Sequence, residues 1–464
     1  MISLGTILVA KYLEGFTKLK ELYHFSLSCI MNLEANHLSG RLPSTLGYLV
    51  NLEIFVINDN NFEGQIPSSI KNWLNVTSIR VQGSGLSGPL PSEIGLLTKL
   101  TKLIISDLNG ASSPFPPLAN LYNMEYLILR SCNIMDVLPS YLDVMGNLTI
   151  LDLNFNKISG QIPSYFYSLA RVENIFLNGN LLNGSVPEWM LETGNNIDLS
   201  YNKFEALLSN GCQSRLTIPI FKLCNRQEFV SFWFLQYHKP CSNYSYSLHI
   251  NCGGKEVTIS GTTFEGDVDP GEPSVFLSSK TNWGFSNTGL FLYDTGVSVD
   301  YIELNHSLNF PTPYSELYES ARVSPISLTY YAYCLGNGNY RISLHFSEIV
   351  LTNDTKLGGH GRRVFNIYIQ VTLQGKLVVK DFNIVDAAGG ILKPVIKRIP
   401  VAVTSNTVEI RFYWAGKGTF LTIENNTGYG PLISAISIEP GDGFGPLALP
   451  SFYIRLLLEC SLKA

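Results

Sequence analysis

The sequence is poor in charge and has no long apolar run. Of its 464 residues only 15% are Asp, Glu, Lys or Arg, where an average globular protein has about 25%. Its 32 basic residues are outnumbered by 37 acidic ones, so it lacks the basic excess that binding to nucleic-acid phosphates requires. No run of about 18 consecutive apolar residues occurs, so the sequence predicts no transmembrane helix. We therefore expect neither nucleic-acid binding nor a membrane span in this chain.

The motifs of several enzyme classes are missing too. The seven histidines form no H-E-x-x-H pattern and no pair at metal-ligand spacing, and no C-x-x-C pair offers thiolates to zinc. No G-x-S-x-G elbow occurs, and the Gly-Asn-Gly turn at 336–338 lacks the lysine and helix of a phosphate loop. We therefore predict no catalytic residue, no metal site and no cofactor.

The chain nevertheless has the composition of a folded protein. Apolar residues make up 45% and aromatic residues 12%, which excludes intrinsic disorder. Five segments are expected. These are a divergent N-terminal segment (1–30), a repeat region (31–204), a linker that contains cysteines (205–246), a second domain (247–440) and a divergent tail (441–464).

A 24-residue repeat organises the first half. Its template, L-x-x-L-x-L-x-x-N-x-L-x-G-x-I-P, recurs from residue 52 and from residue 148, with Ile or Phe at some of the Leu positions. Seven in-phase copies of this kind have the leucine-rich-repeat pattern. The template Asn falls at a constant spacing of 24, at Asn36, Asn60, Ser84, Leu108, Cys132, Asn156 and Asn180.

Each part of the template has a physical role. One short L-x-L strand per copy stacks into a parallel sheet, and the Asn side chain can bond backbone groups where the chain leaves that sheet. The Ile-Pro pair begins the return segment, where a missing N–H is tolerated. The copy around Leu108 carries Ser-Ser-Pro-Phe-Pro-Pro at 112–117 and is expected to deviate. Cys132, at an Asn position, is predicted to be a buried structural thiol.

Side chains that flank the sheet leucines should line the concave face of the solenoid. They mix aromatic, aliphatic and charged residues, which favours a binding surface for a protein or peptide. The alternative is an ordinary solvated face with scattered apolar residues. Arg80, Lys102 and Arg130 would lie on neighbouring strands and form a strip that faces an anion. The candidate ligand-binding residues are Arg80, Lys102, Tyr126, Arg130, Asp152 and Phe176.

Seven N-x-S/T acceptors and eight cysteines favour an extracellular location. The first ten residues lack the basic start of a signal peptide, and Lys11 and Glu14 interrupt the apolar stretch early. The candidate disulfide cysteines, whose pairing the spacing leaves open, are Cys212, Cys224, Cys241, Cys252 and Cys334. The candidate glycosylation sites are Asn75, Asn147, Asn183, Asn243, Asn305, Asn353 and Asn425.

The second domain has the pattern of many short strands separated by turns, which is typical of a β-sandwich. Its motifs resemble those of a malectin domain. They are N-C-G-G at 251–254, C-L-G-N-G-N-Y at 334–340, H-F-S-E at 345–348, G-R-R-V-F-N at 361–366, K-D-F-N-I at 380–384, W-A-G-K-G-T at 414–419 and Y-G-P-L-I-S at 429–434.

The order of the two domains is similar to that in the ectodomain of plant leucine-rich-repeat malectin receptor-like serine/threonine kinases. The resemblance covers residues 31–440 and implies a mostly β fold, a right-handed leucine-rich-repeat solenoid followed by an all-β malectin-type sandwich. It also implies a cell-surface or extracellular protein that recognises an extracellular peptide, protein or glycan, with a possible co-receptor. Members of the family are protein kinases, but no V-A-I-K lysine, H-R-D loop or D-F-G motif occurs here. We therefore expect no enzyme activity from this chain.

Malectin domains resemble carbohydrate-binding modules, which hold sugars with aromatic faces and a few polar groups. The alternative for these aromatic residues is an ordinary place in the sandwich core, and neighbouring Tyr330 and Tyr331 cannot face the same side of a strand. The carbohydrate candidates are Tyr318, Tyr330, Tyr331, Tyr333 and Asp386.

Two other functions fit the sequence. A soluble form could act as a decoy that competes for ligand, or as an inhibitor that blocks a secreted wall hydrolase with its concave face. The chain could also derive from a kinase gene without having activity of its own. Inhibition assays separate the inhibitor from the receptor.

Overall fold

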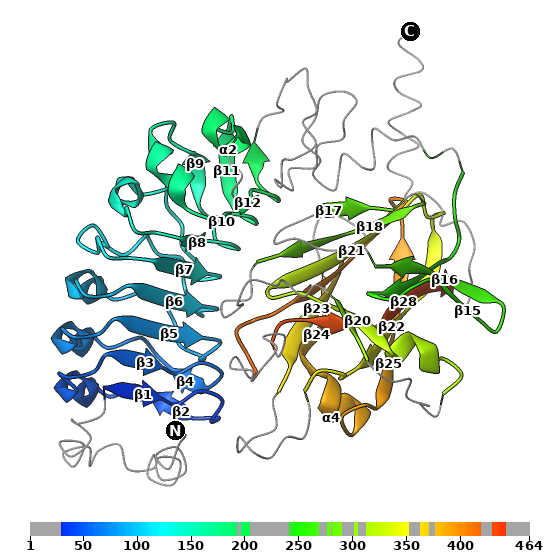
Figure 1. Cartoon of the computed structure of the whole chain (residues 1–464), viewed down its shortest axis with the longest axis horizontal. Coiled ribbons are helices and arrows are strands. Elements are labelled where there is room, and N and C mark those ends of the chain that lie inside the picture. Colours follow the sequence, from blue (N-terminus) through cyan, green and yellow to red (C-terminus); the bar gives the residue numbers. More distant parts are fainter. Residues whose placement is uncertain are drawn as a thin grey trace, which may run out of the picture.

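A computed structural model describes residues 29–192, 196–204, 241, 243–268, 276–279, 281–289, 301–304, 312–351, 362–370, 376–418 and 429–441. Within these ranges the chain forms a repeat solenoid and a β-sandwich that lie side by side (Figure 1). The expected fold class, a leucine-rich-repeat solenoid followed by an all-β sandwich, is confirmed.

The solenoid is built on a parallel sheet of eight strands. Neighbouring strands pair with the repeat offset, so that Ile54 lies beside Ser78 and Lys102 beside Tyr126. In sheet order the strands are β1 (Ile30–Asn32), β3 (Ile54–Val56), β5 (Ser78–Gln82), β6 (Lys102–Ser106), β7 (Tyr126–Arg130), β8 (Ile150–Asp152), β10 (Asn174–Phe176) and β12 (Asn196–Asp198). Shorter pairings follow in β2 (Ser39–Arg41), β4 (Asn61–Glu63), β9 (Ser159–Gln161), β11 (Leu181–Gly184) and β13 (Lys203–Phe204).

The return segments are short helical turns, and template prolines begin most of them. Pro43, Pro67, Pro91 and Pro139 are each in an extended conformation directly before a turn. The copy around Leu108 deviates as predicted, because its residues 112–119 form no helical turn. The turns are η2 (Ser44–Tyr48), η3 (Ser68–Asn72), η4 (Ser92–Leu96), η5 (Ser140–Val144), η6 (Phe166–Arg171) and α2 (Glu188–Glu192).

The template asparagines hold the turns in the way that the sequence predicts. Asn156 accepts hydrogen bonds from the amides of Cys132 (3.0 Å) and Ile134 (3.1 Å). Its amide nitrogen donates to the carbonyls of Leu129 (2.7 Å) and Leu153 (2.9 Å). Because these carbonyls belong to two successive repeats, each such side chain joins one repeat to the next.

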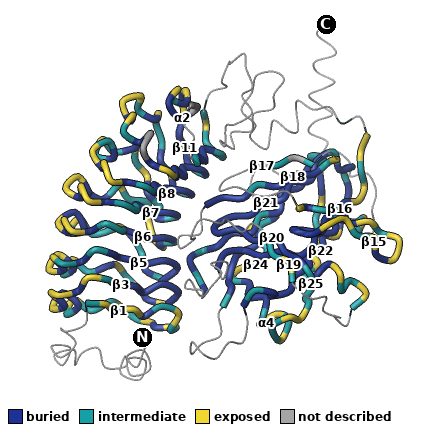
Figure 2. Tube along the Cα trace, in the orientation of Figure 1, coloured by how far each residue is buried: buried dark blue, intermediate teal, exposed yellow. Residues whose placement is uncertain are grey.

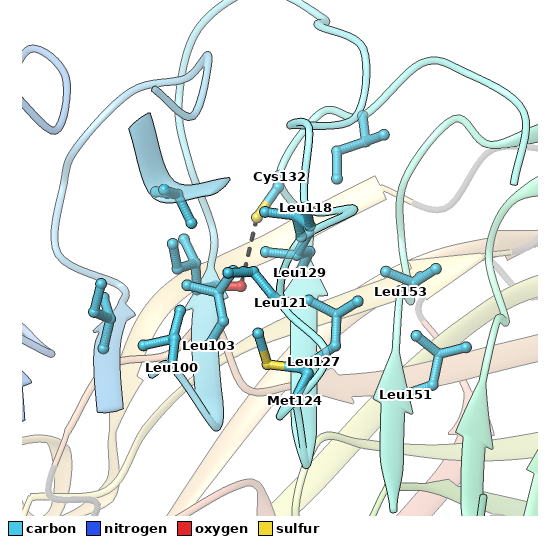
Figure 3. Close-up of a cluster of buried hydrophobic side chains, with 14 of the residues drawn as sticks. Leu100, Leu103, Leu118, Leu121, Met124, Leu127, Leu129, Cys132, Leu151 and Leu153 are labelled. Atoms are coloured by element: carbon cyan, nitrogen blue, oxygen red, sulfur yellow. Dashed lines mark hydrogen bonds between the residues drawn. The ribbon is translucent and has the colours of Figure 1, made fainter. Parts of the chain in front are cut away.

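Cys132 takes the place of an asparagine in this ladder. Its thiol donates weakly to the carbonyls of Ile105 (3.5 Å) and Arg130 (3.4 Å), which lie 27 and 2 residues earlier. Asn156 donates to carbonyls at these same separations. Figure 3 shows the sulfur among the leucines of the solenoid core. The prediction of a buried structural thiol is confirmed.

The sandwich consists of two six-stranded sheets and a smaller three-stranded one. One sheet has the order β15 (Val257–Ile259), β16 (Thr262–Asp267), β14 (Leu248–Cys252), β28 (Ala435–Pro440), β22 (Gly338–Ser347) and β25 (Pro394–Val403). The other has the order β17 (Phe276–Ser278), β18 (Trp283–Thr288), β21 (Ser327–Tyr333), β26 (Thr407–Tyr413), β23 (Val364–Gln370) and β24 (Lys376–Asn383). The small sheet joins β19 (Tyr301–Glu303), β20 (Ser320–Val323) and β27 (Leu432–Ile433), and helices η7 (Ser315–Tyr318) and α4 (Ile384–Ala388) complete the domain.

The side of the solenoid that faces the sandwich is buried, whereas its outer turns are exposed (Figure 2). The sheet that contains β18, β21 and β26 supplies most of the residues that meet the solenoid. The concave face is therefore largely covered by another part of the same chain.

Candidate functional site

One column of residues marks the edge along which the two domains meet. Its members stand directly before the template Asn position, where the chain turns off the sheet, and every one has a positive φ between 48° and 68°. A left-handed backbone at this point aims successive side chains along one edge. We call the set the seam column: Ala35, Asp59, Gly83, Asp107, Ser131, Phe155, Gly179 and Tyr201.

Tyr413, at the end of β26, contacts three successive members of the seam column. Its hydroxyl lies 2.7 Å from the Ser131 hydroxyl and donates to a carboxylate oxygen of Asp107 at 3.1 Å. Its ring meets the Phe155 ring edge to face, with the centroids 5.0 Å apart. One tyrosine of the sandwich thus bridges three repeats.

Further contacts between the two domains lie near the two ends of the seam column. Near the N-terminal end, Arg362 donates to a carboxylate oxygen of Asp59 at 2.5 Å and lies 3.1 Å from His37. Near the C-terminal end, the hydroxyls of Tyr201 and Tyr331 are hydrogen-bonded. Contact therefore extends from the first described repeat to the last.

At Gly83 the two backbones approach closely. A Cβ atom at this position would lie 2.6 Å from the carbonyl carbon of Gly416. Any side chain here would collide with the backbone of the sandwich, so glycine is required for its lack of a side chain.

The centre of the concave face is closed by a charged and aromatic cluster. Arg130 and Asp152 form a buried ion pair with a nitrogen-to-oxygen distance of 3.2 Å. The Arg130 guanidinium also lies over the Trp414 ring of the sandwich, 5.3 Å from its centre. The small space beside them, which Ile326 and Tyr429 also line, has room for about one water molecule.

The structure divides the six predicted ligand-binding residues into two groups. Arg130, Asp152 and Phe176 are each only 2% exposed. Arg80, Lys102 and Tyr126 are half-buried, and the Lys102 ammonium lies 4.5 Å from the centre of the Tyr126 ring. Burial lowers the pKa of Arg80. The predicted cationic strip is therefore interrupted, because Arg130 is covered and paired with Asp152.

A second column has polar side chains that are buried but incompletely bonded. Its members stand two residues before the template Asn position, and each is at most 2% exposed. Each has at least one side-chain nitrogen or oxygen atom without a hydrogen-bond partner among the described residues. We call them the inner polar column: Asn58, Gln82, Ser106, Arg130, Asn154 and Asn178.

Several carboxyl groups at the contact are shifted toward their protonated form. Burial raises the pKa of Asp198 to about 6, although the hydroxyls of Ser200 and Thr288 donate to it. Burial also raises the pKa values of Asp107, Asp152 and Glu409. These groups are costly to ionise where they lie.

The four candidate carbohydrate-binding tyrosines are buried in the sandwich. Tyr330, which donates to Asp267 at 2.5 Å, faces the core. Tyr331, its neighbour on β21, faces the solenoid through Tyr201. The Tyr318 hydroxyl bonds His345 at 3.0 Å, and that of Tyr333 donates to a backbone carbonyl. Asp386, on α4, is exposed and separate from all of them.

The predicted disulfide cysteines and glycosylation sites differ in their bonding and exposure. Cys241 and Cys334 form a disulfide. Cys252 is instead a buried free thiol in the sandwich core, which corrects its assignment as a disulfide candidate. Cys212 and Cys224 lie outside the described residues. Of the sequons, Asn147, Asn183 and Asn243 are exposed, Asn75 is partly exposed, and Asn305, Asn353 and Asn425 lie outside the described residues.

Within the described residues, His, Cys, Asp and Glu form no group of three or more that could hold a metal ion. Among the same residues, no helix has the length and apolar character needed to cross a membrane. The arrangement has the chemistry of a recognition surface, with aromatic, amide and charged groups.

The seam column is the part of the site that the sequence prediction missed. Sequence reasoning selects concave positions by their alternation with the sheet leucines, and the residues of the seam column do not follow this alternation. A signal was present, because Asp59, Asp107, Ser131, Phe155 and Tyr201 recur at intervals of 24 residues or about twice that. Without the position of the second domain, this recurrence could not be distinguished from ordinary turn residues.

Two known protein families match the chain, one in each half. Residues 246–436 match the malectin domain, and residues 51–73 and 147–169 match the leucine-rich repeat. Two probable leucine-rich-repeat receptor-like serine/threonine-protein kinases of Arabidopsis thaliana are each 45% identical to the chain, over 300 and 324 residues. These matches cover 62% and 67% of this chain but 28% and 31% of the relatives. The chain thus spans less than a third of their length.

Solved plant receptors are similar to the chain over a smaller part. The Arabidopsis receptor kinase HAESA, in complex with the peptide hormone IDA and the co-receptor SERK1, is 34% identical, with a TM-score of 0.37. The match covers 38% of this chain and 30% of that one. The plant peptide hormone receptor RGFR1, in complex with RGF2, is 26% identical, with a TM-score of 0.36, covering 38% of this chain and 28% of that one.

Proposed function

Because the chain belongs to the plant family of leucine-rich-repeat, malectin-containing receptor-like serine/threonine kinases, we propose that it acts as a ligand-binding ectodomain. It recognises a peptide, protein or glycan outside the cell, at the cell surface, and works together with a co-receptor. The observation that carries this proposal is the union of two recognition domains in one chain that matches such kinases over both of them.

The accessible part of the concave face favours an acidic ligand. Arg80, Lys102 and Tyr126 lie on three neighbouring strands, β5, β6 and β7, and remain half-buried where the rest of the face is covered. Two cationic side chains and an aromatic ring suit a carboxylate or sulfate group on a peptide. For a glycan ligand, Asp386 is the candidate that stays exposed.

Binding by the full glycosylated chain tests the proposal. Calorimetry against a panel of synthetic extracellular peptides, acidic and basic, and of wall oligosaccharides should identify a ligand class. For an acidic peptide, Arg80→Glu and Lys102→Glu should each weaken binding by at least about tenfold. Arg341→Glu is the matched control, because Arg341 is exposed on β22, in the sheet that faces away from the solenoid.

Two results would contradict the proposal. The first is that no member of the panel binds, while the chain inhibits a secreted wall hydrolase. The second concerns the site alone: an acidic peptide that binds equally well to all three variants must contact the chain elsewhere.

A further inference from the structure

The contact between the solenoid and the sandwich is unlike a permanent protein core. The inner polar column places six buried side chains on the concave side of the solenoid, with Arg130 directly against Trp414 of the sandwich, and each of the six has a polar atom without a partner among the described residues. The sandwich adds two more such atoms, in Glu409 and Arg411 of β26. A buried polar atom without a partner is unfavourable, so this contact contains a cost that separation of the two domains would remove.

The same contact contains more acidic than basic groups. Asp59, Asp107, Asp152, Asp198 and Glu409 lie at or beside it, together with the guanidinium groups of Arg130, Arg362 and Arg411. Five carboxyl groups therefore face three permanent cations and His37. Protonation of some carboxyl groups would balance the charge.

Two of the carboxyl groups already have cationic partners. Asp152 pairs with Arg130 and Asp59 with Arg362. Arg362 also lies beside His37, and Arg130 lies over Trp414. The Asp59–Arg362 pair joins the two domains while both groups are charged, whereas the Arg130–Asp152 pair lies within the solenoid and meets the sandwich through Trp414.

The other three carboxyl groups, those of Asp107, Asp198 and Glu409, have mainly neutral hydrogen-bond partners. Asp107 accepts from Tyr413 and is near Arg130, Asp152 and the Cys132 thiol. The groups that face Asp198 are Ser200, Thr288 and, at longer range, Asp152. Those that face Glu409 are Arg411, Tyr201 and Tyr331.

We propose that the contact between the solenoid and the sandwich is a proton-dependent latch, which closes over the concave face in acid and releases it near neutral pH. In the closed form a large ligand cannot reach the inner polar column. In the open form the column is a row of amide, hydroxyl and guanidinium groups in water. This inference goes beyond the proposed function, because opening requires no ligand.

The carboxyl groups determine in which direction the closure of the contact depends on pH. Asp198 has a pKa of about 6 in the closed form, whereas an ordinary aspartate has 3.8. The closed form therefore binds more protons than the open form between about pH 4 and pH 6. Closure is then most favourable at or below about pH 4 and is weakened as the pH rises through about 6.

Small-angle X-ray scattering from the full chain tests the latch. A compact body of 464 residues has a radius of gyration of about 23 Å. We expect the radius to increase reversibly, by about 10% or more, when the pH is raised from 4.5 to 7.5. The double variant Asp198→Asn with Glu409→Gln carries neutral side chains of the same shape, so it should stay compact at pH 7.5.

The matched control is Asp386→Asn with Glu303→Gln, which neutralises two exposed carboxyl groups outside the contact. This control should expand like the wild-type chain. Circular dichroism and an intact Cys241–Cys334 disulfide show whether each variant is folded. Should the double variant fail to fold, the wild-type titration alone still decides. An unchanged wild-type radius, or equal expansion of the double variant and the control, overturns the proposal.

Discussion

Single residues of the template hold the solenoid together, and Asn156 is the clearest case. It makes five hydrogen bonds to backbone groups of its own repeat and of the preceding one. Replacing it with alanine would leave several buried groups without partners. Asn156→Ala should therefore lower the free energy of unfolding by about 2–4 kcal/mol, measured as a shift of the guanidinium midpoint.

Asn36→Ala is the matched control, since Asn36 is partly exposed and donates to the carbonyl of Glu34 two residues away. Its effect should stay within about 0.5 kcal/mol. Equal losses from the two substitutions would show that the ladder is not what stabilises the repeats.

His345 provides a residue-scale test of pH dependence. Burial, with Arg398 and His249 nearby, lowers its pKa to about 4, and its ring bonds the Tyr318 hydroxyl. The unfolded chain, with an ordinary histidine pKa of 6.5, then binds more protons between these values. The sandwich should lose up to about 3 kcal/mol of stability as the pH falls from 6.5 to 4.

Thermal unfolding at several pH values measures this effect, and His345→Gln should show a smaller decrease over the same range. The effect runs opposite to that of the latch, because it concerns unfolding of the sandwich and not its contact with the solenoid. A stability that does not change between pH 6.5 and 4, in both proteins, would contradict the assignment of a neutral His345.

The segments of the sandwich that reach the solenoid depend on one buried ion pair. Arg363, directly after Arg362, donates to Glu348 at 2.8 Å and to the carbonyls of Tyr429 and Gly430. Both charged side chains are fully buried. Glu348→Gln would remove the carboxylate charge beside the buried guanidinium and should cost about 3–5 kcal/mol in thermal or chemical unfolding.

Glu439→Gln is the matched control, because its pair with Arg341 is exposed. Surface pairs contribute about 1 kcal/mol or less. If the two glutamine variants unfold alike, the buried pair does not support the segments that meet the solenoid.

At the element scale, sequence reasoning identified the repeats because their pattern is local. Asn60 and Asn156 bond backbone groups that the 24-residue spacing already places beside them. The turn at 112–117 deviates because of its prolines, which the sequence also reveals.

The candidate site was less predictable. Burial of Arg130 depends on Trp414, which lies more than 280 residues further along the chain. No periodicity in the repeats contains that information.

In the whole molecule, the packing of the sandwich against the solenoid determines which residues of the concave face remain accessible. The sandwich covers the part of the concave face that contains Arg130, Asp152 and Phe176, and leaves Arg80, Lys102 and Tyr126 half-buried. A ligand of the closed form would therefore reach the concave face only where Arg80, Lys102 and Tyr126 remain accessible, or would bind the sandwich itself. Which surfaces are available is decided by the contact between the domains and not by the repeats alone.

Hydroxyl-radical footprinting of the full chain at pH 4.5 tests that contact most directly. Phe176 is 2% exposed and lines a small space together with Trp414 and Tyr429 of the sandwich, whereas Tyr122 and Tyr48, on the outer turns, are 58% and 69% exposed. We predict that Tyr122 and Tyr48 are oxidised readily and that Phe176 is protected, together with Tyr413 of the sandwich. Oxidation of Phe176 at the rate of a fully exposed phenylalanine would show that the concave face is open and would contradict the account.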